Sequence, residues 1–357
     1  MSGEYADELR DLANMIPDSI APLKVVVMPD FFLDHFLYYP KSLEQFKDEV
    51  TSVYNRKGGE IAGYRQRIAI GGNAVNTAVA LASLGAMVVA IVKTSPLGLK
   101  LLEHMAPPRV DLSLVHVDGE LSLAFNIEVE GVNVMFGDSK GLDLDFGSMR
   151  DKELAVLRGA DYVCVFNWVY NRSGTALAAE VFRYVKSYGV GKTLLDISDP
   201  TPRLSEIPEL IEQVLEPNLV DILCLNENEA YILASQIDEK SGIRPPDAEP
   251  SAIPTVMAEK ISKHIRSRVD LHTPDYSLSF KDGKLLAMAP SFKVRVLRVT
   301  GAGDVWTAAN IVGESMRLSD RHRLLLANAA AAIYISEPNV KYPNLRDIKS
   351  FIMKSLT

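Results

Sequence analysis

The segment Arg298 to Asn310 (RVTGAGDVWTAAN) carries the residues best suited to catalysis in this sequence. Its glycines follow a strand-like run, Phe292 to Val299, and open an apolar helix. Free backbone N–H groups at such a helix start bind anions, and the helix dipole favours negative charge there. Asp304 lies at the same place, where a carboxylate accepts the proton of an attacking hydroxyl while the amides stabilise a transferred phosphoryl group. The pattern indicates phosphoryl transfer, and a plain helix cap is the alternative.

A second glycine-rich segment, Ile70 to Gly85 (IGGNAVNTAVALASLG), has paired glycines before a helix and two asparagines in the first turn of that helix. Gly71 and Gly72 allow a small polar ligand to approach the main chain closely. Asn76 can present its amide to neutral hydroxyls. A strand-to-helix turn with an asparagine cap is the alternative.

The elements that must position these segments are visible as short β-branched runs that alternate with helix-like segments. The strand-like runs are 24–28, 87–92, 161–166, 193–197 and 221–225, and the helix-like segments include 73–84, 176–187 and 210–215. This alternation predicts an α/β fold with a mainly parallel sheet and helices on both faces. The length fits one large domain or one domain with an appendage, and we expect a single domain over residues 1–357. Ligands of such sheets bind at the carboxyl ends of the strands.

Two regions break this alternation. Residues 36–67 contain a turn-like Lys57-Gly58-Gly59, and residues 121–136 alternate apolar and polar side chains around Glu130-Gly131, which is a hairpin signal. We expect the two regions to form a small sheet that acts as a lid. Residues 1–22 are expected to add an N-terminal helix.

Composition argues against several classes of protein. A net charge of −8 and a pI near 5.4 do not fit a protein that binds nucleic acid or an anionic membrane through a basic face. The N-terminus does not resemble a secretion signal, and the longest apolar stretch, Ala78 to Val92, is shorter than the ~20 residues that span a bilayer. Cys164 and Cys224 lie in apolar strand-like runs, which favours core roles over a disulfide or a zinc site. We expect a soluble, cytoplasmic protein.

The two glycine-rich segments, in this order, resemble the signatures of the PfkB family of carbohydrate kinases, which are ribokinase-like. The resemblance spans most of the chain and implies a three-layer αβα sandwich with a mainly parallel central sheet and a small β-sheet lid. It implies a Mg²⁺-dependent kinase that transfers the terminal phosphoryl group of ATP or ADP to a hydroxyl of a sugar or nucleoside. By the same resemblance Asp304 is the general base, and the anion hole is formed by Gly301, Ala302 and Gly303.

The resemblance also implies substrate contacts. MPDFFLDHF is similar to the opening strand of the family, in which an aspartate binds substrate hydroxyls, so Asp34 matches that residue and Asp30 matches the acid nearer the strand. Gly72 and Asn76 match substrate contacts of the first signature.

Metal and nucleotide contacts are implied in the same way. LNENEA resembles the Asn-x-x-Glu motif that organises Mg²⁺ largely through water, which implicates Asn226 and Glu229, and a helix start with capping residues is the alternative. Asn328 resembles the asparagine near the nucleotide base, and a helix-surface amide is the alternative.

The chain departs from the family pattern at two places. The Asp-Thr-Thr that helps many relatives hold a monovalent cation is replaced by Arg298, Val299 and Thr300, so dependence on such a cation is open, and Arg298 either supplies positive charge directly or faces solvent. The usual Thr-x-Gly of the donor site is replaced by LHTPD, in which proline lacks the N–H that glycine offers. Thr273 is kept as a candidate phosphate contact, and the donor is ATP or ADP.

Polar residues after two further strands are secondary candidates. Asp196 and Asp199 are turn residues or neighbours of the nucleotide or metal. The candidates for substrate discrimination, in which Trp168 either stacks on a sugar or base or lies in the core, are Asn167, Trp168, Asn171 and Arg172.

Three other functions compete with a sugar or nucleoside kinase. A sugar-phosphate kinase of the fructose 6-phosphate or ribose 1-phosphate type needs cations for its second phosphate, for which Arg172, Lys93 and Lys140 are available. A non-catalytic sugar or nucleotide sensor has no need of Asp304. A dinucleotide-dependent oxidoreductase would have Gly-x-Gly-x-x-Gly after the first strand, and the sequence lacks it there.

A homodimer through the lid is also considered. Relatives of the resembled family often dimerise there, and the region 36–67 offers the aromatic residues Tyr38, Tyr39 and Tyr54 to such an interface.

Overall fold

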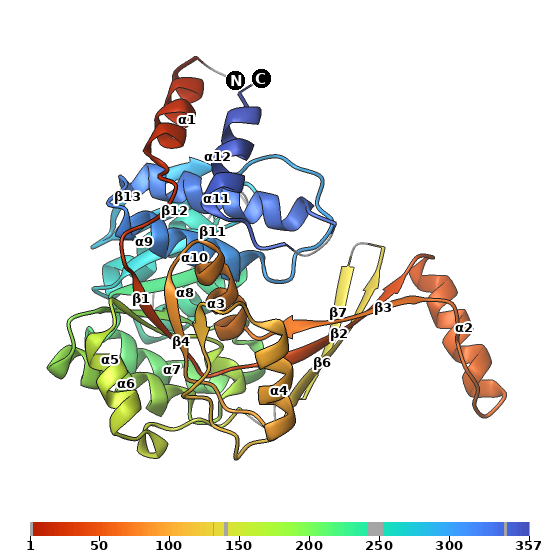
Figure 1. Cartoon of the computed structure of the whole chain (residues 1–357). Coiled ribbons are helices and arrows are strands. Elements are labelled where there is room, and N and C mark those ends of the chain that lie inside the picture. The colour runs from red at the N-terminus through yellow and green to blue at the C-terminus, as the bar shows by residue number, and fades with distance from the viewer. Residues whose placement is uncertain (1–2, 131, 139–141, 242–252, 339–340, 357) are drawn as a thin grey trace.

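The computed structural model describes residues 3–130, 132–138, 142–241, 253–338 and 341–356, and its centre is a nine-stranded sheet (Figure 1). The strand order is β13-β12-β11-β10-β9-β8-β1-β4-β5. The strands from β11 to β5 pair in parallel, whereas β12 and β13 are antiparallel. The strands are β1 (Lys24–Met28), β4 (Met87–Ala90), β5 (Val110–Asp111), β8 (Tyr162–Val165), β9 (Lys192–Asp196), β10 (Ile222–Asn226), β11 (Arg268–His272), β12 (Tyr276–Lys281) and β13 (Lys284–Pro290).

Helices cover both faces of this sheet and complete three αβα layers, as predicted. The central strands are buried on both faces, which is why β1 and β8 have the continuous apolar sequences KVVVM and YVCV. One face is covered by α1 (Gly3–Met15), α3 (Asn73–Ser83), α4 (Pro96–Met105), α10 (Ala302–Ser315), α11 (Asp320–Ser336) and α12 (Leu345–Lys354). The other face is covered by α5 (Asp151–Gly159), α6 (Gly174–Tyr188), α7 (Ile207–Leu210), α8 (Glu227–Ser241) and α9 (Ile253–His264).

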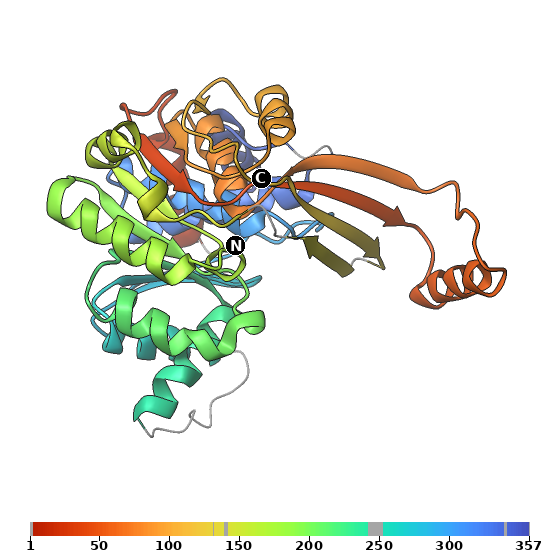
Figure 2. The same cartoon turned by 90° about the horizontal axis from the view of Figure 1, so that it is seen from below.

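The predicted small sheet exists, and Figure 2 shows it projecting from the body as a lid. Its strand order is β3-β2-β6-β7, with β2 and β6 parallel and the outer pairs antiparallel. Its strands are β2 (Phe32–Tyr39), β3 (Arg65–Gly71), β6 (Ser122–Val129) and β7 (Val132–Asp138). The predicted lid segments are too short where the lid joins the body, because β2 begins at Phe32 and β3 ends at Gly71. Residues 36–67 also contain a helix, α2 (Leu43–Asn55), at the end of the lid remote from the body. Gly131 of the predicted hairpin lies outside the described residues.

The strand-like run Phe292 to Val299 is not a strand, so that prediction is wrong. The last strand, β13, ends at Pro290, and residues 291–299 continue as a loop. The ring centroid of Phe292 lies 5.2 Å from that of Phe351 in α12, and the N–H of Leu297 donates to the carbonyl of Ile335 in α11. Phe292 therefore packs on a helix instead of pairing in the sheet, whereas Val296, Leu297 and Val299 are exposed.

Other features predicted outside the site have definite positions. Helix α1 packs against α12 and buries Leu9 and Leu12. The predicted N-terminal helix over residues 1–22 is shorter than expected, because residues 16–22 are not helical. Cys164 and Cys224 are buried free thiols. Within the described ranges, no helix has the length and apolar character needed to cross a membrane.

Candidate active site

Helix α10 begins at the glycine-rich turn and places Asp304 in its first turn. Gly301 precedes the helix with φ 85°, and a Cβ at this position would lie 2.6 Å from the hydroxyl of Tyr334, so only glycine fits. Asp304 is buried, and Asn76 Nδ2 in the first turn of α3 donates to Asp304 Oδ2 at 3.0 Å. The Tyr342 hydroxyl donates to Asn76 Oδ1 at 3.1 Å. The two glycine-rich segments therefore meet at one carboxylate.

Four buried aspartates influence one another around this carboxylate. Burial raises the pKa of Asp304 well above its ordinary value, and the negative charges of Asp196, Asp30 and Asp34 raise it further. Burial and then the charge of Asp30 raise the pKa of Asp34 to about 7. Burial is also the main cause that raises the pKa of Asp196 to about 7. Buried carboxyl groups with raised pKa values at the carboxyl edge of a parallel sheet are typical of a functional site.

The two aspartates that follow β1 have different surroundings. Asp30 accepts hydrogen bonds from two backbone N–H groups of α3 at 2.8 and 3.0 Å and from Asn167 Nδ2 at 2.8 Å. Gly72 has φ 89°, and a Cβ there would lie 2.7 Å from Asp30 Oδ2. Asp30 and Gly72 thus fasten α3 to β1. No described residue donates a hydrogen bond to Asp34, which leaves the carboxylate of Asp34 available to a ligand.

A pocket between the lid and the body opens beside Asp34 and Asn76. Its lining includes Asp34, Phe36, Tyr38, Glu128, Arg298 and Tyr334. Asn133 Nδ2 in β7 donates to Thr300 Oγ1 at 3.0 Å, so the lid touches the loop that leads into α10. The Arg298 guanidinium donates to the carbonyls of Tyr334 at 2.9 Å and Pro338 at 3.1 Å. Arg298 therefore does not simply face solvent, because it ties this loop to the end of α11.

A larger cavity, about 640 Å³, lies at the amino ends of β1 and β4. Most of its lining is aliphatic, and its charged residues are Lys24, Arg109 and Asp111. Parallel sheets bind ligands at the opposite, carboxyl edge. The pocket beside Asp34 is therefore the better candidate by position, although its volume is only about 30 Å³.

The sequence of the chain matches the model of a known protein family. The model for pfkB family carbohydrate kinases matches residues 48–347, which include both glycine-rich segments. The chain belongs to the PfkB family. A search of curated protein sequences found no significant match.

Solved structures confirm the fold of this PfkB protein. Ribokinase from Arabidopsis thaliana, complexed with ribose and ATP, has 20% identity and a TM-score of 0.67, and the match covers 93% of this chain and 99% of that one. Ribokinase from Cryptococcus neoformans with ADP has 16% identity, a TM-score of 0.66 and coverage of 92% and 99%. Adenosine kinase from Sinorhizobium meliloti has 17% identity, a TM-score of 0.66 and coverage of 94% and 100%.

The predicted metal residues form a reciprocal cap at the start of α8. Glu229 accepts hydrogen bonds from the backbone N–H of Asn226 at 2.9 Å and from Asn226 Nδ2 at 2.7 Å, and the N–H of Glu229 donates to Asn226 Oδ1 at 2.9 Å. Burial and then the charge of Asp196 raise the pKa of Glu229 well above its ordinary value. Among the described residues, no group of three or more acidic, histidine or cysteine side chains could hold a metal ion directly. A water-mediated Mg²⁺ fits this donor set, because the cation would relieve the repulsion between buried carboxylates.

The predicted nucleotide residues are engaged by the protein itself. The Thr273 hydroxyl donates to the carbonyl of Tyr276 at 2.9 Å and accepts from the N–H of the same residue at 3.1 Å, which closes the β11–β12 turn. Asn328 is buried, so the alternative of a helix-surface amide is wrong. Its amide accepts from Trp306 Nε1 at 2.8 Å and donates to the carbonyl of Pro290 at 3.0 Å. Nucleotide contacts by Thr273 and Asn328 stay predictions.

Some of the secondary site candidates have structural roles, and others stay candidates. Trp168 is fully buried, and its Nε1 donates to Thr175 Oγ1 at 2.9 Å, so stacking of Trp168 on a substrate is wrong. Asn171 Nδ2 donates to the carbonyl of Leu144 at 2.9 Å, and Asp199 accepts from Thr201 in a turn. Asn167 Oδ1 is buried without a partner among the described residues, so Asn167 stays a candidate.

The described cations that were considered for a second phosphate are each paired with an acid. Arg172 pairs with Asp143 at 3.3 Å, and Lys93 pairs with Asp118 at 3.4 Å. Lys140 lies outside the described residues.

His272 at the end of β11 is a site residue that the sequence reading missed. Its ring packs 5.1 Å from that of Trp306, and a Cβ on Gly303 would lie 3.2 Å from the imidazole. Burial lowers the pKa of His272 to about 4, so the imidazole beside the turn at 301–303 is neutral at pH 7. The signal in the sequence was its position in LHTPD, next to the candidate Thr273.

Proposed function

We propose that this PfkB protein is a Mg²⁺-dependent kinase that transfers the terminal phosphoryl group of ATP or ADP to a hydroxyl of a sugar or nucleoside. The observation that carries the proposal is the position of Asp304. Its buried carboxylate accepts a hydrogen bond from Asn76 beside the pocket and follows directly after the turn at 301–303, in which the N–H of Ala302 donates to the carbonyl of Val299 at 3.1 Å. Base and anion hole are thus parts of one helix start.

The geometry supports in-line transfer. Asp304 accepts the proton of the acceptor hydroxyl as the hydroxyl oxygen forms a bond to the terminal phosphorus, and the bond from that phosphorus to the bridging oxygen breaks. The N–H groups of Gly301 and Gly303 stabilise the charge on the transferred group, and that of Ala302 joins them only if it gives up its bond to the carbonyl of Val299. Asp34 orients the acceptor, and the lid excludes water. Mg²⁺, held through water by Asn226 and Glu229, would neutralise charge on the phosphates.

The solved relatives support this choice of ligands. The Arabidopsis ribokinase holds ribose and ATP, and the Cryptococcus ribokinase holds ADP. Thr273, Asn328 and Asn226 are the proposed nucleotide contacts. For Thr273 and Asn328 this requires contacts through the remaining lone pairs or hydrogens, because their present bonds hold the turn and helix α11 in place.

Asp304→Asn tests the proposal. We expect turnover to fall by at least ~10²-fold, as for loss of a general base, while nucleotide binding stays measurable by calorimetry. Asp282→Asn, in the exposed turn between β12 and β13, is the matched control and should keep wild-type turnover. Near-normal turnover of D304N would contradict the proposal. If the wild-type protein bound nucleotide and sugars but phosphorylated no acceptor, a non-catalytic sensor would replace it.

A further inference from the structure

The register of the lid strands arranges its inner face in rows that lead away from Asp304. Asp34, Phe36 and Tyr38 of β2 line the pocket, so residues directly opposite them share this inner face. The row nearest the body joins Ala69, Asp34, Ala124 and Gly137. The second row joins Arg67, Phe36, Asn126 and Met135, and the third joins Arg65, Tyr38, Glu128 and Asn133.

Two arginines thus lie along the β3 side of this inner face. Both arginines lie beyond the residues that line the pocket. The guanidinium of the exposed Arg65 lies 5.0 Å from the ring centroid of Tyr38, and Arg67 is half-buried opposite Phe36. Neither arginine makes an ion pair with another residue of the described ranges. Glu128 lies opposite Tyr38 on the other neighbouring strand, β6. Burial raises the pKa of Glu128, and the positive charge of Arg298 lowers it, so Arg298 compensates the charge of Glu128. Arg65 and Arg67 therefore present positive charge that the protein leaves uncompensated.

The end of this inner face nearest the body is negative. Asp34 lies in the first row, and its charge reaches Asp304 together with those of Asp30 and Asp196. An acceptor with an anionic group is repelled from this end and attracted to the arginines, which directs its hydroxyl toward Asp304. Successive rows are about 7 Å apart, because each spans two strand residues. A free pentose with its hydroxyl at Asp34 is too short to reach beyond the second row.

We propose that the acceptor carries an anionic group, a phosphate ester or a carboxylate, that Arg67 and Arg65 bind at the end remote from the reacting hydroxyl. The inference rests on the proposed function and specifies its acceptor. Arginine binds planar carboxylates and phosphates through paired hydrogen bonds, which suits either group. The cations first considered from the sequence, Arg172 and Lys93, are neutralised by Asp143 and Asp118, whereas Arg65 and Arg67 are not.

The test compares acceptors with and without an anionic group. Wild-type protein is assayed with ATP and with ADP on fructose 6-phosphate and ribose 1-phosphate, on gluconate as a sugar acid, and on ribose, fructose and adenosine as neutral acceptors. We expect kcat/KM to be at least ~30-fold higher for one of the anionic groups, and the phosphate and carboxylate arms identify which. Arg67→Gln and Arg65→Gln should lower that value by ~10- to 100-fold, as for loss of a charged hydrogen bond, and leave neutral acceptors within about threefold.

Controls separate binding from folding. Arg67→Lys should recover part of the loss, and Arg56→Gln, whose side chain bonds carbonyls beyond the end of α2, should keep wild-type kcat/KM. Preference for neutral acceptors, or anionic acceptors unaffected by R67Q and R65Q, would overturn this inference and leave the kinase assignment intact. Failure of the wild-type protein to phosphorylate any acceptor would overturn the kinase assignment, and the inference with it.

Discussion

At the scale of single residues, the site holds carboxylates under conditions that disfavour their charge. Asp34 has no hydrogen-bond donor among the described residues, and burial with the nearby charge of Asp30 raises its pKa to about 7. A buried carboxylate with a raised pKa and no hydrogen-bond donor lowers the stability of the folded protein when no ligand is bound. The unfolded chain ionises near pH 3.8, so the unfavourable contribution of Asp34 grows from about pH 4 and is complete above about pH 7.

Asp34→Asn should therefore stabilise the empty protein. The shift of the Asp34 pKa from 3.8 to about 7 corresponds to at most about 4 kcal/mol of unfolding free energy at pH 8. We expect a higher melting temperature for D34N at pH 8 and a smaller difference at pH 5, measured by thermal denaturation without ligands. The KM for the acceptor should rise at the same time. A difference that is negative, or equal at both pH values, would show that Asp34 is not buried as a charge.

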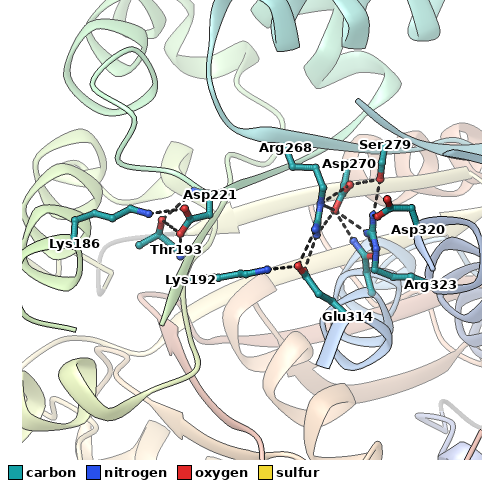
Figure 3. A network of polar contacts seen from close by, with 11 residues as sticks. Lys186, Lys192, Thr193, Asp221, Arg268, Asp270, Ser279, Glu314, Asp320 and Arg323 are labelled. Carbon is teal, nitrogen blue, oxygen red and sulfur yellow. Dashed lines mark hydrogen bonds and ion pairs between the residues drawn. The ribbon is translucent and has the colours of Figure 1, made fainter. Parts of the chain in front are cut away.

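At the scale of elements, a buried ionic network fastens the helices beneath the site (Figure 3). Arg323 of α11 donates to Asp270 of β11 at 3.1 Å, and Asn310 of α10 donates to the same carboxylate at 2.9 Å. Arg268 donates to both carboxylate oxygens of Glu314 at 2.9 Å. Despite burial, the positive charges of Arg268 and Arg323 hold the pKa of Asp270 below its usual range. The network fixes α10 and therefore the orientation of its first turn.

Removing one member should cost much of the stability. Arg323→Met leaves Asp270 without one of its cations in the core, and we expect the free energy of unfolding to fall by about 3 kcal/mol or more in urea titrations. Lys192→Met is the matched control, because the Lys192 side chain is 49% exposed and pairs with Glu314 at the edge of the network, so its loss should be within ~1 kcal/mol. Equal losses for the two variants would mean that the buried network adds no stability.

At the scale of the whole molecule, the outer face of the lid is apolar and exposed. Ile68, Val132 and Phe136 point away from the pocket and are 58%, 61% and 60% exposed. Neighbouring Leu123 and Val134 are also exposed. Apolar side chains gathered on one sheet face are typical of an interaction surface, and a second copy of the chain would cover the same face symmetrically. This surface supports the predicted homodimer through the lid, which stays a prediction.

Charge on this face should separate such a dimer. We expect wild-type protein to sediment as a dimer and the double variant Val134→Asp with Phe136→Asp to sediment as a monomer. Val190→Asp, at a valine outside the lid that is 85% exposed, should stay dimeric. Wild-type protein that sediments as a monomer at micromolar concentration would refute the homodimer.

Local patterns determined much of this protein. Strands buried on both faces need continuous apolar runs, so β1, β8, β9 and β10 were recognisable from the sequence and the α/β sandwich followed from their order. Gly301 and Gly72 have positive φ, a backbone conformation that favours glycine, so the residue type by itself indicates the local structure. Asp304 was predicted for the same reason, because the helix start that holds it is local.

Only the tertiary structure decided which polar residues are free to act. Asp30 and Asp34 look alike in the sequence, but one is bonded by α3 and the other is open, and Trp168 was a core residue instead of a stacking surface. Arg65 and Arg67 became candidates only when the lid register placed them opposite Tyr38 and Phe36. Such partners are distant along the chain, as with Asn76 and Asp304, which lie 228 positions apart. Burial and pairing depend on those long-range contacts, and no local pattern of residues encodes them.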